Sequence, residues 1–188
     1  MTLIPVKPFA LGERSQKFMS GMHPTLIAVF ELAISISPVD FGFSEPQVRT
    51  LAYEKELVAR GASKTLKSNH ILHIDRTGKS ENEYGHAGDA VPWLGGKFVW
   101  DWNLLYSVAA AVAEAARQTK VLDQMCWGGV WDQWMSQYAG KGPAKGQTVT
   151  DYLAAQAAVM RKAEADYCVR HPGKDFVDGP HFQFAVKG

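Results

Sequence analysis

The sequence predicts an α+β fold, because helical and strand-like patterns interleave irregularly along its 188 residues. Apolar residues make up 46% of the chain, which is enough for a sizeable core in one domain. The chain shows no internal repeat, and its helical segments do not alternate with strands as a doubly wound sheet requires. We therefore expect a single α+β domain that spans residues 1–188.

The first part of the chain contains two predicted helices and one short strand. Residues 23–38 carry apolar side chains at helical spacing, with a proline suited to the first turn. Residues 39–45 alternate apolar and polar side chains and predict a strand. Residues 46–61 predict a second helix, since a proline stands at its start and a glycine can cap its end.

The second part of the chain contains two longer predicted helices. Asp101 can cap a helix over residues 102–119, whose apolar residues form a continuous stripe. The aromatic segment 125–134 has a strand-like composition. After a linker rich in glycine and lysine, residues 150–170 predict another helix, and the chain ends in a turn and a strand that carries His181.

Composition and charge argue against several classes of partner. The formal net charge is +1, so there is no overall electrostatic attraction for nucleic acid or an anionic membrane. The apolar stretches are too short or too interrupted to span a bilayer, and no secretory pattern opens the chain. The two cysteines, Cys126 and Cys168, indicate reduced thiols in a protein made in the cytoplasm.

Two clusters of polar residues could supply metal ligands. Asp178 and His181 stand three residues apart around a Gly-Pro turn, so both side chains can reach one point. Metal-assisted hydrolysis needs two or three histidine or carboxylate ligands, a water molecule and a base. Each of these residues alone is typical of a polar surface. The two clusters together lead to the hypothesis that the protein binds zinc. The upstream candidates are His70, His73, Asp75, Asn82, His86 and Asp89.

Five motifs occur in the order typical of one enzyme family: "GASKTLKSNH", "GHAGDAVPW", "GGKFVWDW", "WGGVWD" and "DGPHFQF". With them the chain resembles the zinc peptidases that include D-alanyl-D-alanine carboxypeptidases and L-alanyl-D-glutamate endopeptidases, in particular their bacteriophage endolysin branch. The resemblance covers nearly the whole chain. It implies a single peptidase domain with a small antiparallel sheet flanked by helices, as in the D-Ala-D-Ala carboxypeptidase fold, and a zinc site on that sheet.

The resemblance implies that His70, Asp89 and His181 are the zinc ligands, with water in the fourth position. Asp178 matches the catalytic acid, which would take a proton from the water and deliver it to the leaving amine. Arg49 matches an arginine directed at the substrate carbonyl or the developing oxyanion. A plainer interpretation of Arg49 is a helix-surface residue paired with Glu45 or Glu54. Ser68 would support the arm that carries His70.

The choice of the first ligand depends on the alignment register. The family places its histidine ligand seven residues before its aspartate ligand, and this spacing falls on Asn82. Asparagine is a poor zinc ligand, so this register predicts a weakened site or a zinc-less wall-binding or structural homologue. The other register keeps His70 and requires a hairpin insertion at about residues 73–84, which loop-closure entropy tolerates. We favour His70, because "GASKT" fixes the first arm independently of spacing; His73 is the next candidate, and His86 is a neighbour.

A second departure from the short family members is a helical insertion at about residues 133–172. Its plain interpretation is an amphipathic helix packed on the domain, and a sharper hypothesis makes it a lid or wall-binding element beside the cleft. The six tryptophans are expected mainly in the core and the cleft wall.

We expect a zinc-dependent phage endolysin that hydrolyses a bond of the peptidoglycan stem peptide, L-Ala–D-Glu in the first place, and that acts as a monomer. A D-Ala–D-Ala carboxypeptidase of the same chemistry is the alternative. Without an export signal, the protein would collect in the host cytoplasm and reach the periplasm and cell wall at lysis through a holin.

Overall fold

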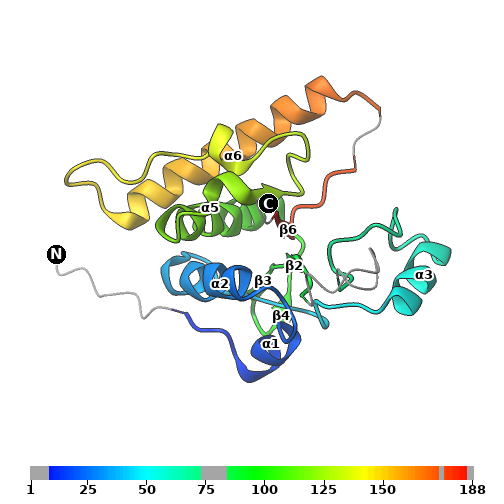
Figure 1. Ribbon diagram of the computed structural model, residues 1–188. Coiled ribbons are helices and arrows are strands. Elements are labelled where there is room, and N and C mark those ends of the chain that lie inside the picture. The colour runs from blue at the N-terminus through cyan, green and yellow to red at the C-terminus, as the bar shows by residue number, and fades with distance from the viewer. Residues whose placement is uncertain (1–8, 73–83, 174–175, 186–188) are drawn as a thin grey trace.

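The structure is a computed structural model that describes residues 9–72, 84–173 and 176–185 (Figure 1). It has two small antiparallel sheets flanked by helices, which confirms the predicted α+β class. The predicted hairpin at residues 73–84, including His73 and Asn82, lies outside the described residues except for Tyr84.

Each of the longer helices begins at a residue whose side chain accepts a backbone N–H of the first turn. In α2 this residue is His23, in α5 it is Asp101, and in α6 it is Thr148. These caps satisfy N–H groups that have no partner within the helix. The α-helices are α1 (Glu13–Phe18), α2 (Pro24–Ile36), α3 (Leu51–Ala59), α5 (Trp102–Gln118) and α6 (Val149–Arg170), and two 3₁₀ turns lie at Leu122–Gln124 and Met135–Gln137.

The prediction that a helix begins at Pro46 is wrong. Helix α3 begins at Leu51, because Thr50 adopts an extended backbone and its side chain caps the helix by accepting from the N–H of Tyr53. Residues 46–50 lie outside any helix instead, and Arg49 forms a parallel bridge with Ile71. The difference matters, because this non-helical segment lies against the candidate site.

Within the described residues, six short strands form the two sheets, and every pairing between these strands is antiparallel. One sheet has the order β1 (Phe41–Gly42), β3 (Val91–Leu94) and β4 (Lys97–Phe98). The other has the order β2 (Ala87–Asp89), β6 (His181–Phe184) and β5 (Met125–Trp127), so the last strand of the chain is central. Only Ala90 separates β2 from β3, and the chain therefore passes directly from one sheet to the other.

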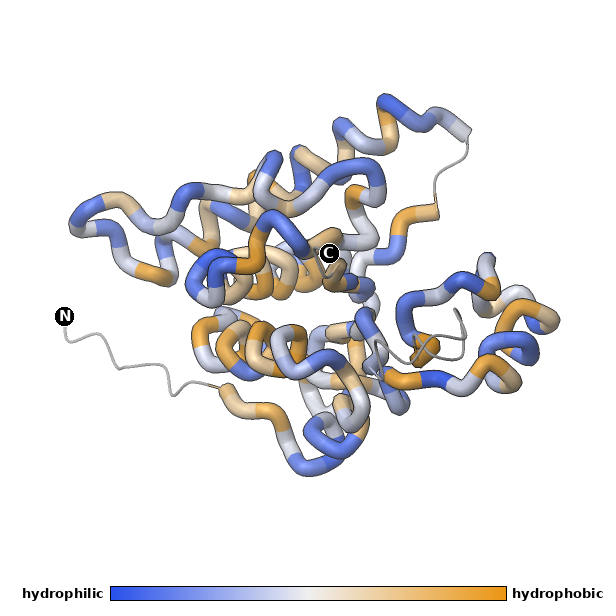
Figure 2. Tube along the Cα trace, in the orientation of Figure 1, coloured by the Kyte–Doolittle hydropathy of each residue, from blue (hydrophilic) through white to orange (hydrophobic). Residues whose placement is uncertain are grey.

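The core is organised around α5. Figure 1 shows α2 and α6 on opposite sides of this helix, and both pack against it. Almost every residue of α5 from Leu105 to Ala116 is buried, because other helices pack on opposite sides of it. Many of these residues are alanines, whose small side chains let two helices approach closely. Figure 2 shows the hydrophobic residues gathered along α2 and α5.

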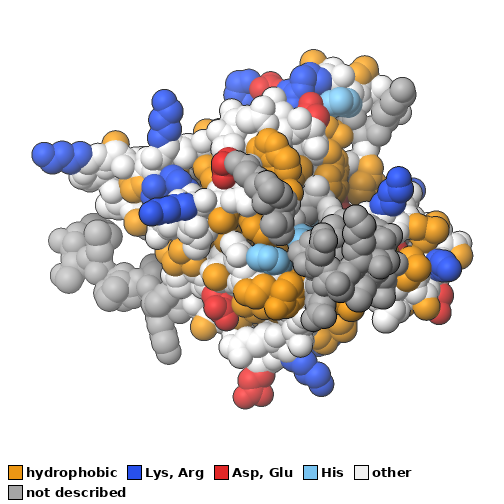
Figure 3. Space-filling model, in the orientation of Figure 1, with side chains coloured by type: hydrophobic (Ala, Val, Ile, Leu, Met, Phe, Trp, Pro, Cys, Tyr) orange, Lys and Arg blue, Asp and Glu red, His pale blue; other side chains and the backbone are white. Residues whose placement is uncertain are grey.

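The surface is mixed in charge. Figure 3 shows basic and acidic side chains interspersed on the drawn face, in keeping with the net charge of +1. Within the described part of the chain, no helix is both long enough and apolar enough to cross a membrane.

Helix α6 contributes to the core through one face. Met160 is fully buried, and Tyr106 of α5 donates a hydrogen bond to Glu164 of α6 over 3.1 Å. We expect Met160→Ala to lower the free energy of unfolding by about 2–4 kcal/mol, because it removes buried apolar volume. The exposed Val169 of the same helix provides a control, since Val169→Ala should change stability by less than about 0.5 kcal/mol. Urea denaturation measures both, and equal small effects would mean that α6 does not stabilise the domain.

Candidate metal centre

Two of the predicted ligands face each other across a strand pair. Asp89 ends β2 and His181 begins β6, and the two residues are direct partners in the antiparallel register. Directly opposite residues project from the same face of a sheet, so both side chains meet on one side. Strand β6 alternates accordingly, with His181 and Gln183 lining the cavity and Phe182 in the core.

The third predicted ligand, His70, comes from the segment that follows α3. Gly61, at φ +72°, ends the helix, and the N–H of Ala62 bonds to the carbonyl of Leu57 in a Schellman motif. Further on, the hydroxyl of Ser68 accepts the backbone N–H of His70 over 3.3 Å, as expected for its supporting role. The arm is then fixed to the core, because the N–H of Arg49 bonds to the carbonyl of His70.

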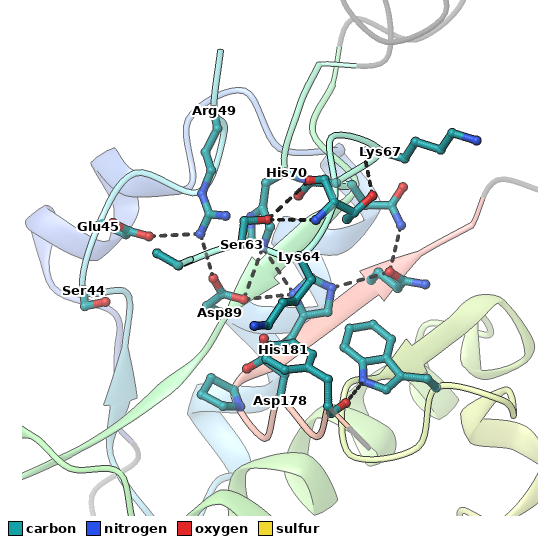
Figure 4. Close-up of a pocket in the computed structure, with 18 of the residues that line it drawn as sticks. Ser44, Glu45, Arg49, Ser63, Lys64, Lys67, His70, Asp89, Asp178 and His181 are labelled. Carbon is teal, nitrogen blue, oxygen red and sulfur yellow. Dashed lines mark hydrogen bonds and ion pairs between the residues drawn. The ribbon is translucent and has the colours of Figure 1, made fainter. Parts of the chain in front are cut away.

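The three predicted ligands converge on one point (Figure 4). His70 Nε2 lies 3.2 Å from His181 Nδ1 and 3.2 Å from Asp89 Oδ1, and the latter two atoms are 3.0 Å apart. A tetrahedral zinc ion with ligands at about 2.0–2.2 Å holds neighbouring ligand atoms roughly 3.3 Å apart. Two imidazole nitrogens and one carboxylate oxygen at this spacing fit a divalent metal ion with one position left open.

The other nitrogens of both histidines have partners that orient the rings. His70 Nδ1 lies 2.8 Å from the backbone carbonyl of Gln47, so it carries the proton and leaves Nε2 free for a metal. His181 Nε2 lies 3.4 Å from Gln183 Oε1, and this oxygen also accepts from Asn69 Nδ2 over 2.7 Å. Both rings therefore turn toward Asp89 the nitrogens that could bind a metal ion.

Gln47 is a site residue that the sequence analysis missed. Its side chain is buried, and its Oε1 accepts the backbone N–H of Asp89 over 2.6 Å while its own carbonyl faces His70. One residue thus contacts two ligand arms. No sequence signal indicated this role, because the segment 46–61 was interpreted as a helix.

Arg49 pairs with Glu45 and Glu54, as the plainer interpretation predicted, and it also contacts Asp89. Its guanidinium contacts Glu45 at 3.0 Å, Glu54 at 3.4 Å and Asp89 Oδ2 at 3.3 Å. It does not lie on a helix surface, and only 12% of its side chain is exposed. The contact with Asp89 leaves Oδ1 of that carboxylate for the histidines, so Arg49 orients a predicted ligand.

Asp178 lines the same cavity, on the loop before β6. The N–H of Asp178 donates to the carbonyl of Gly128, and the N–H of Gly128 donates to the carbonyl of His181. Trp127 also holds this loop, since its Nε1 donates to the carbonyl of Gly179 over 2.7 Å. The turn between Asp178 and His181 is therefore built onto the segment that follows β5.

The cavity has a volume of about 330 Å³, and its walls come from three parts of the chain. The site strands form its floor, residues 62–70 form one wall, and aromatic side chains form another. Trp131 packs against the ring of His181 with 5.0 Å between centroids, while Trp100 and Phe176 are exposed at the rim. Two of the tryptophans thus line the cleft, as predicted.

The pKa values of the two carboxylates, Asp89 and Asp178, are shifted in opposite directions. Burial tends to raise the pKa of Asp89, but the adjacent His70 and His181 overcome this effect and hold its pKa well below the usual range. Burial raises the pKa of Asp178, and the charge of Asp89 raises it further. The site therefore contains one carboxylate that stays ionised and a second that holds a proton more readily.

His86 is not part of this cluster. It is buried, and its ring lies 5.3 Å from His23 and 6.3 Å from Phe184, centroid to centroid. It precedes β2 on the side of the core that carries Phe184. The prediction of a neighbour, not a ligand, agrees with this placement.

An open donor set of two imidazoles and one carboxylate beside a further carboxylate is the arrangement found in catalytic metal sites of hydrolases. The sequence matches the family model of phage L-alanyl-D-glutamate peptidases over residues 7–142, and the chain belongs to this family. The resemblance drawn from the five motifs is therefore confirmed.

Two relatives extend the comparison beyond the family model. The L-alanyl-D-glutamate peptidase of Escherichia phage T5 is 26% identical over 125 residues, which make up 66% of this chain and 82% of that protein. The crystal structure of the L-Ala D-Glu endopeptidase ChiX of Serratia marcescens matches with a TM-score of 0.60 and 27% identity. That match covers 98% of this chain and 96% of the other, so it includes the segment with Asp178 and His181.

The two alignment registers make opposite predictions about metal binding. We expect His70→Ala to abolish tight binding of one Zn²⁺ per chain, because it removes one of three converging donor atoms. His73→Ala and Asn82→Ala should bind Zn²⁺ as the unchanged protein does. Isothermal titration calorimetry on the metal-stripped proteins measures this, and loss of binding in His73→Ala with retention in His70→Ala would overturn the His70 register.

Gly128 packs so closely against the turn that carries Asp178 that no side chain fits at this position. A Cβ atom added at Gly128 would lie 2.3 Å from the carbonyl oxygen of Asp178 and 3.0 Å from Cβ of His181. We expect Gly128→Ala to weaken Zn²⁺ binding roughly 10- to 100-fold by displacing His181. Gly12→Ala is the control, since nothing lies within 4 Å of the added atom there. Equal Zn²⁺ affinities for the two variants in the same titration would contradict this account.

Proposed function

We propose that the protein is a zinc-dependent peptidoglycan peptidase that hydrolyses the L-Ala–D-Glu bond of the stem peptide. The observation that carries the proposal is the convergence of His70, Asp89 and His181 beside Asp178 in one open cavity. The membership of the phage L-alanyl-D-glutamate peptidase family supports the choice of bond, as do the names of the two relatives.

Zinc is the metal that the donor set favours. Two imidazoles and one carboxylate are typical of catalytic zinc sites, whereas magnesium and calcium prefer oxygen ligands throughout. His70, Asp89 and His181 would hold the ion. Bound there, Zn²⁺ supplies a Lewis acid for the scissile carbonyl and lowers the pKa of water in the open position.

Asp178 is the group that we assign to proton transfer. It lines the cavity, it is not a member of the converging donor set, and its raised pKa suits a carboxylate that must both accept and release a proton. As a base it would accept a proton from the attacking water. As an acid it would deliver that proton to the amine of D-Glu as the peptide bond breaks.

Arg49 has a positioning role and a second role that we propose from the family resemblance. Its contact with Asp89 Oδ2 orients that carboxylate, and the flanking Glu45 and Glu54 orient the guanidinium. Because Arg49 also lines the cavity, its remaining N–H groups can donate to the carbonyl oxygen of the substrate as negative charge develops there.

The proposal extends to where and how the protein acts. As a phage lysis enzyme, the protein would be made in the host cytoplasm and would reach the cell wall through a holin, acting as a monomer. The segment at about residues 133–172 would be an insertion in the single peptidase domain, with its helix packed on the domain. Neither nucleic acid nor a lipid bilayer would be a partner.

Products released from purified peptidoglycan test the proposed function. We expect the protein to generate new amino-terminal D-Glu, because the bond on the amine side of D-Glu is cleaved. Free D-Ala without new D-Glu termini would show instead the alternative, a D-Ala–D-Ala carboxypeptidase of the same chemistry. Amino-terminal labelling followed by mass spectrometry distinguishes the two, and no product of either kind would refute the proposed enzyme.

Asp178→Asn is the matched inactive variant for this assay. It keeps the shape of the side chain and the three donor residues but removes the group that accepts the proton. We expect full Zn²⁺ content and an unchanged melting temperature, with a rate lower by roughly 10²–10⁴-fold. Loss of Zn²⁺ from this variant would make Asp178 a ligand and contradict its assigned role.

A further inference from the structure

The wall of the cavity formed by residues 62–70 carries two exposed lysines, Lys64 and Lys67. Figure 4 shows Lys64 extending across the cavity on the side of Asp89 and Asp178, while Lys67 points away toward the outer edge. Neither side chain belongs to the converging donor set. A cation on the wall of a hydrolytic site is a candidate for contact with the substrate, and the surroundings of Lys64 indicate which substrate group it meets.

The hydroxyl groups beside Lys64 are used within the wall itself. Ser63 Oγ bonds to both the N–H and the carbonyl of Thr65, and Thr65 Oγ1 accepts the N–H of Lys67 over 3.0 Å. These turns, in which a side-chain hydroxyl bonds to the backbone two residues on, are typical of Ser and Thr. They fix the backbone on both sides of Lys64, whose ammonium group is the charged group that residues 62–66 place beside the cavity.

The two cationic side chains Arg49 and Lys64, which both line the cavity, differ in whether they form ion pairs. Arg49 is committed to three carboxylates, those of Glu45, Glu54 and Asp89. Lys64 is exposed, and the described part of the chain provides no ion pair for it. An ammonium group in this position can accept an anionic partner without breaking an existing salt bridge.

The proposed substrate carries such an anion next to the scissile bond. Glutamate has two carboxyl groups, and only one of them can continue the peptide chain after D-Glu. The other remains on the residue whose amine is the leaving group, as a carboxylate or, where the bacterium modifies it, as a carboxamide. A carboxylate at this place lies within one residue of the bond that is cut.

We propose that Lys64 forms a subsite for the free carboxylate of the D-Glu residue, so that the protein prefers D-Glu over its amidated form. This inference rests on the proposed function and deepens it. The ammonium group donates a charge-assisted hydrogen bond to the carboxylate, whereas the neutral amide offers a weaker acceptor and no opposite charge.

The expected effect is moderate, because Lys64 is exposed and water competes for both partners. A charge-assisted hydrogen bond at a partly solvated site changes affinity by roughly tenfold. The same contact is present before and during bond cleavage, so it should appear in KM and leave kcat nearly unchanged.

Two synthetic peptides test the subsite. Both are N-acetyl-L-Ala–D-Glu–L-Lys joined through the side-chain carboxyl of D-Glu, and they differ only in an α-carboxylate or an α-carboxamide on that residue. We expect the unchanged protein to show a KM roughly tenfold lower for the carboxylate peptide. In Lys64→Gln the ratio of the two KM values should fall to near one, and Lys64→Arg should retain the preference.

Lys55→Gln is the matched control, because Lys55 is exposed on α3 and does not line the cavity. It makes the same change in net charge and should keep the tenfold ratio. Equal KM values for both peptides with the unchanged protein would overturn the subsite while leaving the proposed function intact. A ratio that survives Lys64→Gln but disappears in Lys67→Gln would also overturn it. Failure to cleave either peptide would refute the proposed function and the subsite with it.

Discussion

The antiparallel pairing of β2 with β6 is the constraint on which the site depends. It places Asp89 opposite His181, and a slip of one residue would turn one of them toward the core. The core prevents that slip. Phe182 is fully buried beside Phe30. A Cβ atom added at Gly88 would lie 2.8 Å from the ring of Phe30. Hydrophobic packing on one face of the strands therefore sets the spacing of ligand atoms on the other.

The third donor residue depends on a different kind of contact. His70 lies outside the sheet, and main-chain and amide groups tie its arm to the strand that carries Asp89. The carbonyl of Gln47 meets the ring of His70, the side chain of Gln47 meets the N–H of Asp89, and Arg49 contacts both arms. The non-helical segment before α3 thus holds His70 beside Asp89, although it is not a strand of either sheet. The buried Gln47 is satisfied by its hydrogen bonds to both arms.

The sequence predicted the parts of the molecule that local interactions determine. Helices α2, α5 and α6 were placed to within two residues at every end, because caps and apolar stripes are local signals. The start of α3 and the role of Gln47 were missed, since both depend on contacts with His70 and Asp89 across the fold. The sequence left His70 and Asn82 open as the first ligand. Spacing along the chain does not show which of the residues before Asp89 lies next to it in the fold.

The long segment between β5 and β6 leaves the geometry of the candidate site intact. The family match ends at residue 142, yet Asp178 and His181 lie beyond it. Strand β6 pairs with β5 through Trp127 and Phe182, and Gly128 bonds to Asp178 and His181 on either side of the turn. These contacts hold the turn directly against β5, and they do not involve the long segment between Gly128 and Asp178. The segment between the two strands then needs only to bury its apolar side chains, and α6 does this by packing on α5. The entropic cost of closing such a loop grows slowly with its length. The geometry of the candidate metal centre therefore does not depend on the length of the segment that precedes Asp178.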